Sequence, residues 1–174
     1  WMVIDGQRIR ILVVEDDNLV AQTISGLLTE HGCEVVGLAM NGCEAVTMTQ
    51  TLRPDVVVMD IRMPDIDGIT ASQLIQETCP TPVIALTAYG DKELVESAAQ
   101  AGVAAYLMKP IAMRELERAI IIARARFADM VAMQKLNKKL AALNADLDLF
   151  SQMVAHDLRS PLAVITSLKR PTSL

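Results

Sequence analysis

The sequence predicts an α/β fold: a doubly wound sheet of five parallel strands, followed by a long C-terminal coiled-coil helix. Three observations carry this prediction. Short β-branched runs alternate with longer helical patterns over 9–110, three of those runs are almost continuously apolar, and 113–160 contains neither Gly nor Pro. Continuous apolar runs are typical of parallel strands buried on both faces. Strands that alternate with helices place those helices on both faces of the sheet.

The elements are expected in a regular order along the chain. Strands are predicted at 9–14, 33–39, 55–60, 82–87 and 104–108, and helices at 18–31, 43–52, 68–78 and 92–101. Gly32 and Gly102 are placed to end the helices that precede them. In an open sheet of this kind, the ligand site lies at the carboxyl ends of the strands, near the point where the strand order reverses.

Composition limits both the core and the compartment. Hydrophobic residues make up 52% of the 174 residues and aromatic residues only 3%, so the core is expected to be aliphatic. Cys33, Cys43 and Cys79 are odd in number and lack CxxC spacing, which favours reduced thiols. No apolar run approaches the roughly 18 residues of a membrane span, and there is no signal-peptide pattern. We therefore expect a cytoplasmic protein without a membrane segment.

Charge is distributed unevenly along the chain. The net charge is −5, with ten basic and seventeen acidic residues in 1–127 but six basic and four acidic residues in 128–174. An acidic body with a slightly basic tail argues against nucleic-acid binding by the body.

The C-terminal helix carries two apolar stripes. The first comprises Leu116, Ile120, Ala123, Phe127 and Met130, and the second comprises Leu136, Leu140, Leu143, Leu147, Phe150 and Val154. Each stripe steps by four and three residues, as in a coiled coil, and the two are one residue out of phase near Gln134. We expect the first stripe to pack on the sheet, and the second, termed the seam below, to form a homodimer.

Polar side chains gather where the predicted strands end. Four strands contribute them: Glu15, Asp16 and Asp17 after the first, Asp60 in the third, Thr87 in the fourth and Lys109 after the fifth. A single Asp at a strand end is more often a helix cap, but this joint arrangement is hard to explain in that way. Converging carboxylates repel each other unless a cation lies among them, and oxygen ligands suit Mg²⁺. A lysine and a hydroxyl group supply the charge and hydrogen bonds that a phosphoryl group needs.

With these motifs, the sequence resembles the receiver domain of two-component response regulators, whose fold is flavodoxin-like. The resemblance spans 9–127 and lies in "VVEDD", "DVVVMDIRMPDIDG", "ALTA" and "AAYLMKP". It implies that Asp60 is the phosphoacceptor, attacking a phosphohistidine or a small phosphodonor as a carboxylate nucleophile. It also implies that Glu15, Asp16, Asp60 and the backbone carbonyl of Arg62 hold Mg²⁺.

The same resemblance implies a switch. Thr87 and Lys109 would hold the phosphoryl oxygens, and Tyr106 would move inward with Thr87 on activation. Pro110 would follow a cis peptide bond. Phosphorylation adds roughly −1.5 to −2 charges, which would shift a population between two packings of the last two strands. The acidic pair begins with Glu15 rather than Asp, a variation that should not abolish metal binding.

A second motif lies near the end of the chain. The stretch "FSQMVAHDLRSPLAVI" resembles the phosphoacceptor box of the dimerisation domain of sensor histidine kinases. His156 matches the phosphorylated histidine, Asp157 the neighbouring acid that orients and deprotonates its ring, and Pro161 the bend that follows.

These resemblances divide the chain into three expected parts. They are a receiver domain at 1–127, a signalling helix at 112–155, and a truncated histidine-kinase dimerisation segment at 145–174. A histidine kinase needs a second bundle helix and an ATP-binding domain, so no autonomous kinase activity is expected. We interpret the chain as a fragment of a receiver-first histidine kinase that works with a kinase or phosphotransfer partner.

Two other outputs remain open at the level of sequence. Receivers also precede helical RNA-binding antiterminator modules, but 128–174 is only weakly basic and has no aromatic platforms for stacking on RNA. Alternatively, the helix serves only as a dimeric docking surface.

Overall fold

The computed structural model describes residues 3–4, 6–88 and 101–167, with the backbone alone at 3–4 and 159–167. Contacts within the chain divide it into two compact units, Trp1–Asp129 and Met130–Leu174. The two units are described separately.

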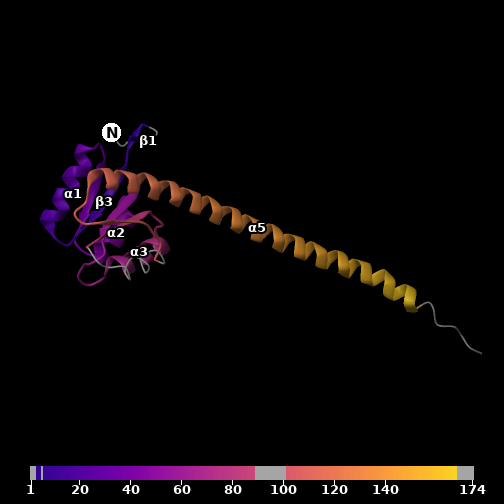
Figure 1. The fold of residues 1–174 in the computed structure, drawn as a ribbon. Coiled ribbons are helices and arrows are strands. Elements are labelled where there is room, and N and C mark those ends of the chain that lie inside the picture. Colours follow the sequence, from indigo (N-terminus) through magenta and orange to yellow (C-terminus); the bar gives the residue numbers. More distant parts are fainter. Residues whose placement is uncertain (1–2, 5, 89–100, 168–174) are drawn as a thin grey trace, which may run out of the picture. The chain divides into compact units, whose positions relative to one another are not determined.

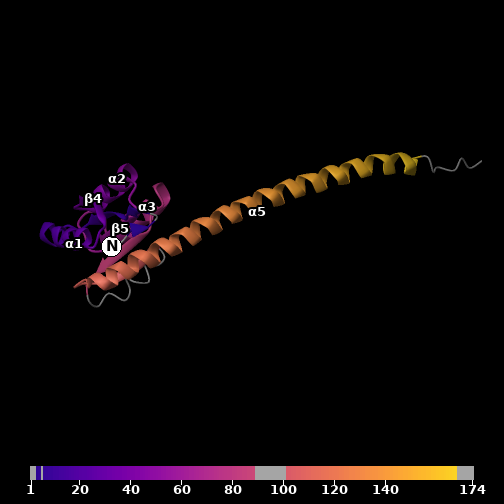
Figure 2. The same cartoon turned by 90° about the horizontal axis from the view of Figure 1, so that it is seen from above.

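The first unit is built on a five-stranded sheet (Figures 1 and 2). Its strands are β3 Arg10–Val14, β4 Glu34–Ala39, β5 Val56–Asp60, β6 Val83–Thr87 and β7 Val103–Met108. The spatial order is β4-β3-β5-β6-β7, and every neighbouring pair is parallel. The chain moves from β3 outward to β4 and then returns to β5 on the other side of β3. The reversal places a crevice at the carboxyl ends of β3 and β5.

The helices of the first unit agree with the sequence prediction to within one residue at each end. They are α1 Asn18–Glu30, α2 Gly42–Leu52 and α3 Gly68–Thr78, and α5 Met113–Ser167 begins in this unit. Asp17, Asn41 and Asp67 cap the first three by accepting hydrogen bonds from backbone N–H groups of the first turn. The helix predicted at 92–101 falls almost wholly outside the described residues.

Two aliphatic cores cover the two faces of the sheet. On one face, side chains of β3 and β5 pack with α1 and with Leu116, Ile120 and Ala123 of α5. On the other face, Leu12, Val14 and their neighbours pack with α2 and α3. The buried residues described include no aromatic side chain, as the composition predicts. The predicted packing of α5 on the sheet is confirmed for Leu116, Ile120 and Ala123 of its first stripe.

Two backbone features outside the sheet are informative. The Lys109–Pro110 peptide bond is cis, as predicted. A short antiparallel pair, β1 Val3–Ile4 with β2 Gln7–Arg8, precedes the sheet and was not predicted, because strands of two residues have no detectable periodicity.

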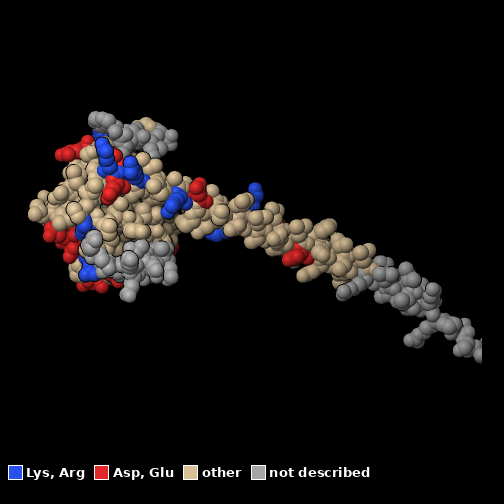
Figure 3. Space-filling model, in the orientation of Figure 1, with Lys and Arg blue, Asp and Glu red and all other residues tan. Residues whose placement is uncertain are grey.

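The second unit contains the later part of α5, drawn in orange to yellow in Figure 1. The helix continues past Pro161 to Ser167, so this proline does not end it. The six seam side chains are 40–64% exposed. Most of the helix surface visible in Figure 3 carries neither Lys or Arg nor Asp or Glu. No described helix is long and apolar enough to cross a membrane.

Candidate functional site

Three carboxylates meet at the crevice between β3 and β5. Glu15 and Asp16 directly follow β3, and Asp60 is the last residue of β5, its neighbour in the sheet. One oxygen from each of the three lies within 4.8 Å of the others. Glu15 and Asp60 are buried, whereas Asp16 is exposed. The sequence prediction that these three side chains converge is therefore confirmed.

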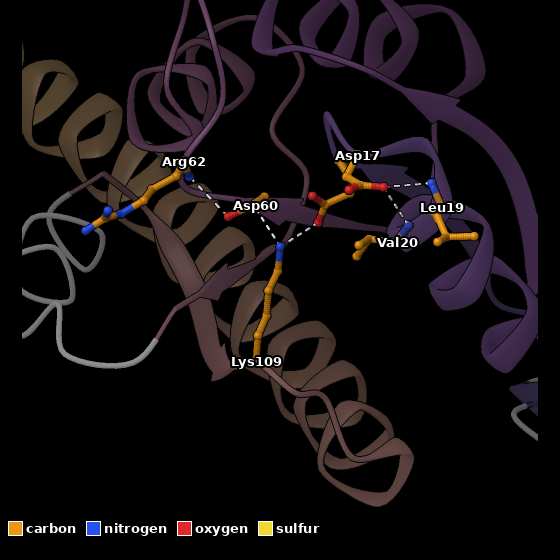
Figure 4. A network of polar contacts seen from close by, with 7 residues as sticks. Asp17, Leu19, Val20, Asp60, Arg62 and Lys109 are labelled. Carbon is orange, nitrogen blue, oxygen red and sulfur yellow. Dashed lines mark hydrogen bonds and ion pairs between the residues drawn. The ribbon is translucent and has the colours of Figure 1, made fainter.

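Lys109 reaches the same place from the loop after β7 (Figure 4). Its Nζ donates to Glu15 Oε2 at 2.7 Å and to Asp60 Oδ2 at 2.6 Å. The side chain is 27% exposed, so these contacts are partly shielded from water. One ammonium group thus offsets part of the repulsion between two buried carboxylates.

Burial and charge shift the protonation of this cluster. Burial raises the pKa of Glu15, the charge of Asp60 adds to this, and the hydrogen bond from Lys109 offsets it only in part. Burial lowers the pKa of Lys109, but the hydrogen bonds to Asp60 and Glu15 outweigh burial and leave it raised. Lys109 therefore stays charged at neutral pH. Because Glu15 binds its proton more tightly when folded, its contribution to stability falls as pH rises through its raised pKa.

The backbone after Asp60 is held closely around its carboxylate. The N–H of Arg62 donates to Asp60 Oδ1 at 3.1 Å. The N–H of Gly68, the first residue of α3, donates to the carbonyl of Ile61 at 2.9 Å. A Cβ atom on Gly68 would lie 2.2 Å from the carbonyl oxygen of Asp60 and 2.8 Å from Cα of Ile61. Sequence reasoning missed this role of Gly68, although a glycine at the start of a helix is a signal for close backbone approach.

The contact between Gly68 and the backbone of Asp60 leads to a stability prediction. Gly68→Ala is expected to lower the free energy of unfolding by about 2 kcal/mol, because rigid backbone atoms have to move apart. Gly26→Ala is the matched control, because Gly26 lies within α1 with nothing within 4 Å of the new Cβ. That variant should be stabilised by about 0.5–1 kcal/mol. Urea unfolding followed by circular dichroism measures both, and equal effects at the two sites would contradict the prediction.

Thr87 is buried at the end of β6, whereas Tyr106 is exposed on β7. Thr87 ends β6 and is 3% exposed; its Oγ1 donates to the carbonyl of Ala88 at 3.1 Å. Its own carbonyl accepts from the backbone N–H of Lys109 at 2.8 Å, so these two residues are joined across adjacent strand ends. Tyr106 lies on β7 with 53% of its surface exposed. It is therefore an outward-facing side chain here.

Asp17 does not belong to the cluster of three carboxylates. Its Oδ1 accepts from the N–H groups of Leu19 and Val20 at 2.8 and 3.2 Å, which caps α1 (Figure 4). Of the three acids after β3, Glu15 and Asp16 therefore belong to the cluster at the crevice, and Asp17 caps α1.

The histidine motif lies in the second unit. His156 Nδ1 is 3.7 Å from Asp157 Oδ1, too far for a hydrogen bond, and the two side chains are 84% and 83% exposed. The ring is therefore open to solvent within this unit.

The strand order, the carboxylates at the crevice and the partly buried Lys109 define a doubly wound α/β domain with an acidic site at the carboxyl edge of its sheet. A family model described as "Response regulator receiver domain" matches residues 11–121, and the chain belongs to this family. The receiver fold predicted from sequence is thereby confirmed.

Two curated relatives show how far the similarity extends. The chain is 40% identical over 125 residues to the transcriptional regulatory protein PdtaR of Mycobacterium tuberculosis, covering 72% of this chain and 61% of that protein. It is 39% identical over 140 residues to a protein-glutamate methylesterase/protein-glutamine glutaminase of Archaeoglobus fulgidus, covering 74% and 40%. The match thus spans less than two thirds of either relative.

Solved structures agree with the family. The response regulator domain of Thermotoga maritima CheB is 31% identical with a TM-score of 0.64, covering 68% of this chain and 98% of that chain. The receiver domain of a modulated diguanylate cyclase from Desulfovibrio desulfuricans is 32% identical with a TM-score of 0.65, covering 70% and 98%. Both matches cover nearly the whole of the solved receiver domain.

Proposed function

We propose that Asp60 accepts a phosphoryl group, and that this reaction controls an output carried by α5. One observation carries the proposal: three carboxylates and the ammonium of Lys109 converge where β3, β5 and β7 end. A carboxylate oxygen of Asp60 attacks the phosphorus atom of a phosphohistidine or a small phosphodonor. The new P–O bond forms as the bond to the donor breaks, and the donor leaves with the electron pair.

The chain's own groups have distinct parts in this reaction. Lys109 already contacts Asp60 Oδ2 at 2.6 Å, so its charge is in place to hold a phosphoryl oxygen. The hydroxyl group of Thr87, at the end of the adjacent strand, is assigned to a second oxygen. Tyr106 is exposed before the reaction, and its inward movement would follow that of Thr87.

The donor set fits Mg²⁺. Glu15, Asp16 and Asp60 offer hard oxygen atoms close together, and the backbone carbonyl of Arg62 belongs to the second residue after Asp60. Mg²⁺ would supply charge neutralisation for the phosphoryl oxygens.

Mg²⁺ is therefore expected to stabilise the fold. At ten times its dissociation constant, Mg²⁺ should raise the free energy of unfolding by about 1.4 kcal/mol. Asp16→Asn should lose most of this response, while the neighbouring Asp17→Asn should keep it, because Asn also caps helices well. Thermal unfolding at constant ionic strength, with and without Mg²⁺, measures the effect. Equal responses in the two variants would place the ion elsewhere.

For the output, we propose a homodimer formed by the seam, continuing into a histidine-kinase-type segment around His156. Two observations support it: the seam side chains are 40–64% exposed at coiled-coil spacing, and the imidazole of His156 is open to a kinase domain. Receiver domains act with histidine kinases or phosphotransfer proteins, and such a protein is the proposed partner. A cytoplasmic location stays a prediction from sequence.

A transcriptional output is the second candidate. The name of the mycobacterial relative, a transcriptional regulatory protein, favours it. Phosphorylation of His156 by an added histidine-kinase domain would support the kinase-type output. Its failure under conditions in which Asp60 is phosphorylated would favour the transcriptional one.

A further inference from the structure

A second polar cluster lies at the opposite edge of the sheet from Asp60, where β5 and β6 begin. A hollow of about 290 Å³ opens here, termed the basal hollow. Pro54, Pro80 and Pro82 line it together with Asp55, Thr81 and three residues of α5, which are Arg124, Phe127 and Ala128. All of these residues belong to the first unit. The hollow is thus separate from the carboxylate cluster.

The guanidinium of Arg124 is poorly satisfied beside this hollow. Its Nη1 is covered by protein atoms and has no hydrogen-bond partner in the described part of the chain. Its Nη2 lies 3.8 Å from Asp55 Oδ1, which is an ion-pair contact but too long for a hydrogen bond. The backbone N–H of Arg10 donates to Asp55 Oδ2 at 2.8 Å. Because a buried donor without an acceptor costs free energy, an acceptor that reached Arg124 would relieve that cost.

Few contacts hold the guanidinium group of Arg124 in its present position. The 3.8 Å contact with Asp55 holds its guanidinium only loosely, and the side chain is 28% exposed. The guanidinium of Arg10 is already engaged, because its Nη1 donates to the carbonyl of Arg53 at 3.0 Å. Arg124 is therefore the arginine that lines the hollow and has a buried donor without an acceptor in the described part of the chain.

We propose that the basal hollow binds a carboxylate that is attached to an apolar group. The guanidinium of Arg124 turns toward the hollow and donates two parallel hydrogen bonds to the carboxylate, the geometry that arginine favours. The apolar group packs against the proline rings and Phe127. The volume lies at the lower end for ligand pockets, so the ligand is the size of one or two side chains. This site needs neither Asp60 nor Mg²⁺ and is independent of the proposed function.

The test uses a matched pair of probes on the full, ¹⁵N-labelled chain. Phenylacetate carries the carboxylate and a ring, whereas phenylacetamide keeps the ring and shape without the charge. Phenylacetate should shift the amide resonances of Thr81, Phe127 and Ala128 and the Nε resonance of Arg124 in a saturable way. Phenylacetamide should bind about 10-fold more weakly or worse. Asp60→Asn should give the same result as the parent chain.

Two variants make the assignment to Arg124 specific. Arg124→Gln should weaken phenylacetate binding about 10-fold or more, while Arg126→Gln, an exposed arginine of the same helix outside the hollow, should not. Thermal unfolding shows whether Arg124→Gln is folded; if it is not, Phe127→Leu replaces it and should also weaken binding. Equal binding of the two probes, or full binding by folded Arg124→Gln, would overturn the proposal, as would no shifts at these residues.

A second binding experiment distinguishes two sources of the carboxylate, which are a segment of a partner protein and a free small acid. A blocked Glu-Phe dipeptide presents the same two groups as a protein segment does. Tighter binding of the dipeptide than of phenylacetate supports a partner protein as the source, and tighter binding of phenylacetate supports a free small acid.

Discussion

Asp60→Asn is expected to abolish phosphate transfer to the chain. Incubation of the parent chain with acetyl phosphate and Mg²⁺ should add one phosphoryl group, detected as intact mass. The amide in Asp60→Asn is not a nucleophile that can replace the carboxylate, so no phosphorylated species should appear. The change should leave the fold intact, because an amide keeps the size of the side chain and its oxygen can still accept from Arg62 N–H.

Two control variants sharpen this experiment. Asp65→Asn makes the same chemical change at an exposed residue of the following loop, whose positive φ of 67° an Asn tolerates well. It should be phosphorylated like the parent chain. His156→Gln should also be phosphorylated, because the proposed acceptor of the acetyl phosphate group is the carboxylate of Asp60. Phosphate that persisted in Asp60→Asn and vanished in His156→Gln would instead identify a histidine phosphotransfer protein.

Leu143→Asp is expected to convert a dimer into a monomer. In the proposed dimer, the seam would place one Leu143 from each chain in the interface, where each buried leucine would contribute about 2 kcal/mol. Losing two of them, and introducing two like charges, should weaken dimerisation roughly 1,000-fold. Light scattering over a range of concentrations gives the mass of the particle and its dissociation constant.

Ala142→Asp is the control for the seam. It introduces the same side chain one residue away, off the seam, at an exposed position of the same helix. It should leave the dimer nearly unchanged. A parent chain that is monomeric at tens of micromolar would remove the proposed dimer, and equal dissociation by both variants would show that the seam is not its interface.

The three central strands of the sheet could be predicted from the sequence because they are buried on both faces. The runs ending at Val14, Asp60 and Thr87 are so continuously apolar that their bounds differ from those observed by one residue at most. The two short strands Val3–Ile4 and Gln7–Arg8 could not be predicted, because strands of two residues have no detectable periodicity.

The residues that form the candidate site could be predicted from the sequence, but their detailed contacts could not. Strand ends brought Glu15, Asp16, Asp60 and Lys109 together, because parallel strands share one carboxyl edge. The separate task of Asp17 could not be recognised, since an aspartate that caps a helix and one that faces a cation look alike in sequence. The double contact of Lys109 depends on the exact position of its long side chain, which no spacing encodes.

The aliphatic cores have an optical consequence. Since the buried residues described include no Trp, Tyr or Phe, packing of the sheet contributes no aromatic signal from those positions. The chain has one Trp, at its first position, and two Tyr, of which Tyr106 is exposed on β7. In a Trp1→Phe background, tyrosine emission therefore comes from Tyr89 and Tyr106 alone. The chain thus carries, on the strand proposed to switch, a native fluorophore that needs no label.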